Sequence, residues 1–210
     1  MAALSQDRTL MGWLSAGDAC TDEEQKKNYD LHWQVARMVH GPDATKSQRY
    51  PLKRAVFGHI YGGGAEAMAN GARISLEQAQ AVKSAIAALA PGLTAWDAQM
   101  REYVRGGGRE FTAYSGRVIW LDRRWPHKAA NYLIQGTARE FLVDALIEWE
   151  KTPWGGCVIL PVHDELIAVV PEQDAQAATA ALVACMQNSL AGVTIAAEPS
   201  PPSFAWQDAG

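Results

Sequence analysis

Apolar residues recur at spacings of three and four along residues 1–110, which predicts that helices dominate this part of the chain. A polar stretch from Asp18 to Asn28 is expected to be a loop, and Gly62-Gly63-Gly64 is expected to end a helix. Ser75 followed by Gln78 is the capping-box pattern that begins another helix. The pattern predicts helices over residues 2–15, 29–40, 49–61, 75–90 and 94–104.

The second half of the chain mixes helical and extended patterns. β-branched and aromatic residues around Ser115-Gly116 predict a hairpin over residues 111–121. Two apolar runs flank His163-Asp164-Glu165 and predict a second hairpin, which Pro171 ends. Helices are expected over 129–149 and 175–190, and a short strand over 193–196. The predicted fold class is therefore α+β.

Composition narrows the class of protein. With 210 residues, 48% of them hydrophobic, the chain can bury a core as one domain or two small ones. It contains neither a run of about 18 apolar residues nor a secretory leader pattern, so no membrane partner is expected. Three scattered cysteines argue against a disulfide framework or a cysteine-based zinc site and favour a cytoplasmic location.

Charge is distributed unevenly along the chain. The net charge of −4 argues weakly against nucleic-acid binding. Residues 101–128, however, hold seven Lys and Arg against three Asp and Glu, whereas residues 129–210 hold two against ten. A basic segment beside an acidic one is typical of a protein that binds phosphates in one place and cations in another, although on charge alone ordinary surface variation is the preferred explanation.

Four residues spaced by four form the first candidate site: Arg49, Lys53, Phe57 and Tyr61. On a helix they lie within a band of about 120°. Two cations near a helix N-terminus suit a polyphosphate, and two aromatic rings further along suit a sugar or a base. Pro51 is expected in the first turn, where its missing N–H costs nothing. The alternative is an amphipathic helix with a basic end and an aromatic core face.

His163-Asp164-Glu165 forms the second candidate. Two adjacent carboxylates on a rigid hairpin suit Mg²⁺, and Mg²⁺-assisted phosphoryl transfer uses two ions held by carboxylates from separate segments. This hairpin supplies one such segment. The alternative is an ordinary acidic turn.

Two further patterns carry weaker signals. In Asn131-x3-Gln135-Gly136-Thr137-Ala138, a polar residue and a glycine interrupt an apolar helical stripe. The glycine permits close approach of another backbone, from nucleic acid or from a neighbouring helix. His32 is a lone histidine on a helical pattern, which is more often structural than functional.

In this order along the chain, these segments resemble family A DNA polymerases, the group of bacterial DNA polymerase I and many phage enzymes. Arg49-x3-Lys53-x3-Phe57-x3-Tyr61-Gly62 resembles motif B on the fingers helix. Val162-His163-Asp164-Glu165 resembles motif C. Asn131-x3-Gln135 resembles a helix beside the primer–template duplex, and the likeness runs from Ala2 to about Val170.

The resemblance implies a right-hand polymerase fold, with a helical fingers subdomain and part of an antiparallel-sheet palm. Residues 1–40 would be palm-to-fingers helices, 41–110 the fingers and 111–210 the palm. The implied substrates and partners are dNTPs and primer–template DNA. The implied cofactor is Mg²⁺.

The resemblance also assigns roles by position. Arg49, Lys53 and His32 would contact the triphosphate, and Lys53 would assist protonation of pyrophosphate. Phe57 would pack on the sugar and Tyr61 would stack at the templating position. Asp164 would hold metal, and Glu165 would support the primer terminus beside it. The implied DNA contacts are Arg117, Asn131, Gln135 and His163.

One family feature is not found. Motif A precedes a segment similar to Ala2-Ala3-Leu4-Ser5-Gln6-Asp7, so its metal-binding Asp would fall before Met1. Asp7 and Asp18 are not convincing substitutes. The chain is therefore expected to be inactive alone, either as half of a split polymerase whose second chain supplies motif A, thumb and remaining palm, or as a truncated product. The rival hypothesis is a non-catalytic nucleotide- or DNA-binding module, and an unrelated metal-dependent nuclease is disfavoured.

Overall fold

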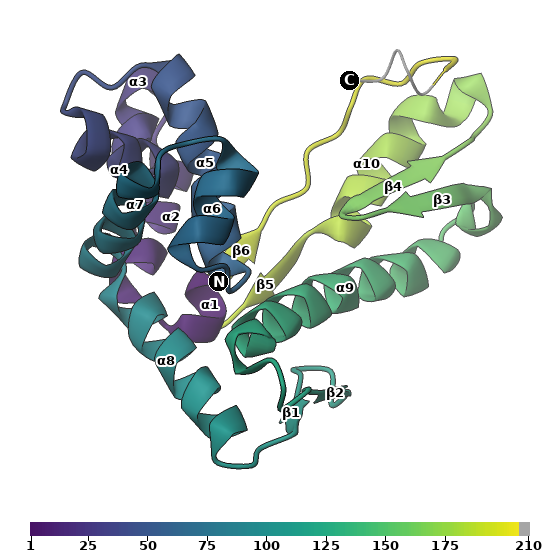
Figure 1. The fold of residues 1–210 in the computed structure, drawn as a ribbon. Coiled ribbons are helices and arrows are strands. Elements are labelled where there is room, and N and C mark those ends of the chain that lie inside the picture. The colour runs from purple at the N-terminus through teal and green to yellow at the C-terminus, as the bar shows by residue number, and fades with distance from the viewer. Residues whose placement is uncertain (206–210) are drawn as a thin grey trace. The chain divides into compact units, whose positions relative to one another are not determined.

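The computed structural model describes residues 1–205 and divides the chain into two compact units. The first unit is Met1–Ile134, and the second begins at Gln135. Each unit is described by itself below. Helix α9 (Ala129–Glu150) is continuous across the boundary (Figure 1).

The first unit is mainly helical, as its sequence pattern predicts (Figure 1). Its helices are α1 (Ala2–Ser5), α2 (Arg8–Ala19), α3 (Glu23–Lys26), α4 (Leu31–His40), α5 (Lys46–Ile60), α6 (Ala65–Ala72), α7 (Leu76–Leu89) and α8 (Pro91–Arg105), with short 3₁₀ turns η1 (Lys27–Tyr29) and η2 (Pro126–Lys128). The capping box of Ser75 and Gln78 that the sequence predicts is present at the start of α7.

The prediction of one helix over residues 2–15 is wrong. Gln6 adopts a left-handed backbone (φ 52°), which ends α1. Asp7 then caps α2, since its carboxylate accepts a hydrogen bond from the Leu10 N–H at 2.9 Å. Aspartate is a favoured residue at a helix N-cap, where its carboxylate satisfies N–H groups that have no partner within the helix.

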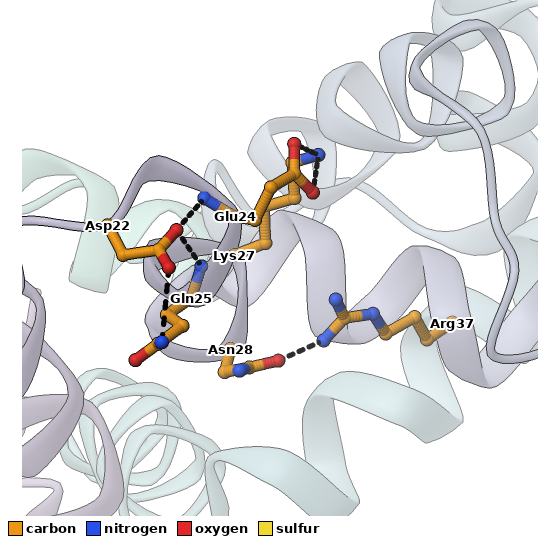
Figure 2. Close-up of polar contacts among 6 residues, drawn as sticks. All are labelled: Asp22, Glu24, Gln25, Lys27, Asn28 and Arg37. Carbon is orange, nitrogen blue, oxygen red and sulfur yellow. Dashed lines mark hydrogen bonds and ion pairs between the residues drawn. The ribbon is translucent and has the colours of Figure 1, made fainter.

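The prediction of a loop over residues 18–28 is also wrong. Here α2 extends to Ala19, and α3 and η1 follow. Asp22 caps α3 by accepting hydrogen bonds from the N–H groups of Glu24 and Gln25, and Asn28 accepts one from Arg37 at 2.7 Å (Figure 2). Local side-chain hydrogen bonds therefore order a segment that has little apolar surface to bury.

Helix α5 begins at Lys46, three residues earlier than predicted. Thr45 and Gln48 form a capping box that sets this start. Pro51 consequently lies inside the helix and not in its first turn. Lys53 is likewise two turns from the N-terminus, beyond the first turn where the helix dipole acts strongly.

A shared apolar core holds α4, α5, α6 and α7 together. Val35, Leu52, Val56, Val82 and Ile86 are fully buried. Helix α8 begins at Pro91, earlier than the predicted Thr94, because a proline suits the first helical position.

The predicted hairpin around Ser115-Gly116 is present. Strands β1 (Glu110–Thr112) and β2 (Val118–Trp120) pair antiparallel, with Phe111 opposite Ile119. Ile119 packs with Leu133 in a small core, so the hairpin rests on the first turns of α9. The exposed residues of β2 are Val118 and Trp120.

The second unit holds the other two hairpins. Strands β3 (Val158–Val162) and β4 (Glu165–Ala168) pair antiparallel as predicted, after a 3₁₀ turn η3 (Gly155–Cys157). A 3₁₀ turn η4 (Glu172–Asp174) leads into α10 (Ala175–Met186). The predicted helix over 175–190 is therefore too long, because residues Asn188–Leu190 form β5, which pairs with β6 (Val193–Ile195).

The fold is α+β, as expected, with three two-stranded antiparallel sheets among the described residues. None of the helices in residues 1–205 is long and apolar enough to cross a membrane.

Candidate nucleotide and DNA site

The structure places His32, Lys53, Phe57 and Tyr61 together in the first unit. Phe57 is central: its ring lies 5.3 Å from that of His32 and 6.2 Å from that of Tyr61, measured between centroids. The Lys53 Nζ lies 5.8 Å from the Phe57 ring centroid. Helix periodicity aligns Lys53 and Phe57 on α5 with Tyr61 at its C-cap, and the packing of α4 on α5 adds His32.

The aromatic rings of this group are partly open to solvent. Phe57 is 37% exposed and Tyr61 is 43% exposed, although both lie on a helix whose opposite face is fully buried. The alternative of an aromatic core face on α5 is therefore wrong, since Leu52, Ala55 and Val56 form that face. Exposed rings beside the Lys53 ammonium are available to a ligand.

Gly62 ends α5 under strict geometric constraint. It has a left-handed backbone (φ 87°), and a Cβ on it would lie 2.0 Å from the carbonyl oxygen of His127. Both the positive φ and this close contact exclude any residue with a side chain at position 62. The glycine after Tyr61 fixes where the helix stops and hence the position of the Tyr61 ring.

Arg49 joins the group through Asp30. The Arg49 Nη2 donates to Asp30 Oδ2 at 2.5 Å, and the guanidinium carbon lies 5.2 Å from the Trp33 ring centroid. Two buried nitrogens here, Arg49 Nε and His32 Nδ1, have no hydrogen-bond partner among the described residues. Buried polar atoms without partners mark places where a ligand or water can bind.

Burial lowers the pKa of His32 below its ordinary value of 6.5. The nearby Asp30 raises this pKa, whereas the charges of Arg49 and Lys53 lower it. The balance favours neutral imidazole, which can either donate or accept a hydrogen bond.

Asn131 and Gln135 lie one turn apart on the same face of α9. Gln135 is exposed, and the buried Asn131 Oδ1 has no partner within residues 1–205. Arg117 lies just before β2 and is exposed. Arg117 and Asn131 belong to the first unit, whereas Gln135 belongs to the second.

His163 and Asp164 form the two-residue turn between β3 and β4, and Glu165 is the first residue of β4. All three side chains are exposed. His163 has a left-handed backbone (φ 54°), a conformation that histidine tolerates better than most residues. The tight turn therefore holds two carboxylates at the tip of a short hairpin.

Carboxylate oxygens are the ligands that Mg²⁺ prefers, and one or two protein carboxylates are enough when substrate phosphates and water complete its coordination. Asp164 and Glu165 supply ligands of that type. Within residues 1–205, no three His, Cys, Asp or Glu side chains are clustered to hold a metal by themselves. The hairpin thus carries carboxylates of the kind that a Mg²⁺ site uses.

Asp7 has a structural role. It is 2% exposed, and both of its carboxylate oxygens accept backbone hydrogen bonds, from Leu10 at 2.9 Å and Leu93 at 3.0 Å. The sequence offered no sign of the second bond, because Leu93 is 86 residues away. Asp30 was likewise missed as a partner of Arg49, although Asp before a helical run is a recognisable cap.

The first unit thus exposes basic and aromatic side chains along α5, and the second unit carries a hairpin with two exposed carboxylates. Residues 1–199 match the family model described as DNA polymerase family A. The DNA polymerase of Mycobacterium phage D29 is 30% identical over 208 residues, covering 98% of this chain and 32% of the relative. The chain belongs to DNA polymerase family A.

Other comparisons agree. The DNA polymerase of Mycobacterium phage L5 is 30% identical over 206 residues, covering 98% of this chain and 32% of that relative. The solved structure of the POL domain of Pol1 from M. smegmatis, in complex with DNA primer-template and dNTP, has the same fold. Its TM-score is 0.72 at 23% identity, over 92% of this chain and 35% of that one. The chain spans about a third of the length of the phage polymerases it matches.

Proposed function

We propose that this chain contributes the nucleotide-binding helix and one metal-binding hairpin of a DNA-directed DNA polymerase. The observation that carries the proposal is the contact group of His32, Lys53, Phe57 and Tyr61 on α4 and α5. It combines a cation, a neutral imidazole and two exposed rings within the reach of one nucleotide. Its composition suits a deoxynucleoside triphosphate.

Within this group, we assign the triphosphate to Arg49, Lys53 and His32. The two cations supply charge, and the His32 ring supplies a hydrogen bond. We also propose that Lys53 donates a proton to the leaving pyrophosphate. Phe57 packs against the sugar, and Tyr61 stacks at the templating position.

Four residues are proposed to contact primer–template DNA: Arg117, Asn131, Gln135 and His163. Asn131 and Gln135 share a face of α9 and would contact the nascent base pair in the minor groove. Readout there is degenerate, so these contacts test the shape of the pair more than its sequence. Arg117 would contact the backbone of the primer strand.

Asp164 would hold Mg²⁺ with Glu165 beside it. The metal would supply charge stabilisation for transfer of a nucleotide from dNTP to the primer 3′-hydroxyl. Two such ions are clamped by carboxylates from separate segments, and the β3–β4 hairpin is one segment. We therefore propose that catalysis needs a second polypeptide segment that supplies further carboxylate, thumb and palm.

The first test is binding of Mg²⁺–dNTP to the purified chain, measured by calorimetry. Lys53→Ala and Arg49→Ala should each weaken binding by about tenfold or more, because each removes a charged phosphate contact. Arg54→Ala is the matched control, since Arg54 is an exposed cation on the same helix. Equal affinities in all four proteins would contradict the proposal.

The second test separates a polymerase from a non-catalytic binding module. The chain is mixed with a polypeptide carrying the remaining palm and thumb of a family A polymerase, and Mg²⁺-dependent primer extension is measured. Asp164→Ala should abolish extension while leaving dNTP binding nearly intact. Glu172→Gln, which removes an exposed carboxylate elsewhere in the second unit, should change neither. Extension that survives Asp164→Ala would overturn the assigned role.

A further inference from the structure

The guanidinium of Arg49 contacts side chains from the start of α4 on two sides. Asp30 accepts a hydrogen bond from Nη2 at 2.5 Å, and the Trp33 ring lies 5.2 Å from the guanidinium carbon. The Arg49 side chain is 18% exposed and that of Asp30 is 32% exposed. This pair is therefore better shielded from water than a surface ion pair, which contributes little because solvent screens it.

Asp30 is itself held in one orientation. Its Oδ1 accepts the N–H groups of His32 at 2.6 Å and Trp33 at 3.1 Å, which makes Asp30 the N-cap of α4. Its Oδ2 is thereby turned to Arg49. One carboxylate links a helix start to a side chain 19 positions later in the chain.

Trp33 has a second cation beside its ring. It lies in the first turn of α4, and the Lys27 Nζ lies 5.0 Å from its ring centroid. A cation over an indole face is attracted to the negative face of the ring. Arg49 itself contacts Asp30 and Trp33. Its Nε is buried and has no hydrogen-bond partner among the described residues.

We propose that Asp30 and Trp33 are positioning residues that hold the Arg49 guanidinium in place before the nucleotide arrives. The inference rests on the proposed function of Arg49. A free arginine side chain populates many rotamers, and fixing it in advance removes the entropy cost of ordering it from binding. Asp30 acts through Arg49 and makes no contact with the substrate.

Charge alone predicts that loss of the Asp30 carboxylate would tighten nucleotide binding, whereas a positioning role predicts that it would weaken binding. Removing the Asp30 carboxylate leaves one more net positive charge beside the triphosphate, which by itself would tighten anion binding. If positioning dominates, the same change weakens binding. The direction of the effect therefore distinguishes the two.

Asp30→Asn is the informative variant, because asparagine caps a helix about as well as aspartate but cannot form the ion pair. Asp43→Asn is the matched control: it removes the same charge from an exposed turn residue of the first unit. Circular dichroism checks that both variants keep the helical content of the parent chain.

The first measurement uses the chain without nucleotide. Arginine side-chain NMR follows the Arg49 Nε–Hε group, whose hydrogen exchange we expect to be about tenfold faster in Asp30→Asn than in the parent or in Asp43→Asn. Trp33→Leu should accelerate the exchange by a smaller factor. An unchanged exchange rate in Asp30→Asn would overturn the proposal without any nucleotide being bound.

The second measurement is a double-mutant cycle on Mg²⁺–dNTP affinity with Asp30→Asn, Arg49→Ala and both together. We expect Asp30→Asn to weaken binding about fivefold to tenfold alone, and by less than twofold when Arg49 is already alanine. Unchanged or tighter binding in Asp30→Asn, or the same loss in both backgrounds, would overturn the positioning role. If Arg49→Ala itself leaves affinity unchanged, the proposed role of Arg49 fails instead, and the exchange measurement alone decides whether Asp30 holds it.

Discussion

Asp7 and Leu93 are joined by a buried hydrogen bond, in which the Leu93 N–H donates to Asp7 Oδ2 at 3.0 Å. The other oxygen of the same carboxylate accepts from Leu10 at 2.9 Å. One side chain therefore satisfies N–H groups at the starts of two helices, α2 and α8, that are distant in sequence. These two hydrogen bonds also explain how the Asp7 carboxylate can be buried, with only 2% of the residue exposed.

Asp7→Ala is expected to lower the free energy of unfolding by about 2–4 kcal/mol, because it removes a cap and leaves two buried N–H groups without an acceptor. Urea denaturation followed by circular dichroism measures this change. Asp22→Ala, which removes the exposed cap of α3, should cost about 1 kcal/mol or less. Equal losses in the two variants would contradict the linking role of Asp7.

Gly92→Ala should also destabilise the chain, since a Cβ there would lie 2.8 Å from Asp7 Oδ2 and 3.0 Å from Asp7 Cα. Forcing these atoms apart typically costs about 1–3 kcal/mol. The contrasting variant is Gly71→Ala on α6, where a Cβ meets nothing within 4 Å. That change should stabilise by about 0.5–1 kcal/mol, and thermal melts of both proteins measure the difference in sign.

Pro51→Ala should raise the melting temperature. Pro51 lies in the interior of α5, where it cannot donate a backbone hydrogen bond to Ser47, and an interior proline costs about 3 kcal/mol relative to alanine. We expect a gain of about 1–3 kcal/mol. Pro91→Ala, at the first position of α8, should give no gain, because proline is favourable there. A gain in the second variant and none in the first would show that the helix register is wrong.

The left-handed backbone of His163 predicts a specific order of tolerance at the β3–β4 turn. His163→Asn should be nearly neutral, since asparagine adopts positive φ readily. His163→Val should lose about 1–2 kcal/mol more, because a β-branched side chain strains that conformation. Urea denaturation of the two variants tests the order, and the reverse order would contradict the turn geometry.

Acidification should destabilise the first unit through His32. Its pKa is lowered in the folded chain, chiefly by burial, so the unfolded chain takes up a proton first as the pH falls. The free energy of unfolding is therefore unaffected by His32 well above its ordinary pKa of 6.5, and it falls as the pH drops below that value. Unfolding at pH 7.5 and pH 5.5 should therefore show a larger loss in the parent chain than in His32→Gln. Equal losses would mean that the pKa of His32 is not lowered by folding.

Much of the fold could be predicted from sequence periodicity. The capping box at Ser75, the stripe of α9 and both hairpins around turn residues are local patterns, and local patterns act through hydrogen bonds within a few residues. Several errors fall at helix starts set by a capping side chain, at Asp7, Asp22 and Thr45, and helix α6 was not predicted. They also fall at residues 188–190, where pairing with β6 overrides a helical pattern.

The sequence by itself determined the candidate chemistry: four residues spaced by four on one helix, and two carboxylates at a hairpin turn. Both depend only on the repeat of a helix and on turn geometry. Tertiary structure decided which partners these residues have. It brought His32 to Phe57 and Asp30 to Arg49, because the packing of α4 against α5 joins residues that no local pattern relates. It also buried Asp7 between two helix starts, because a contact across 86 residues follows from packing alone.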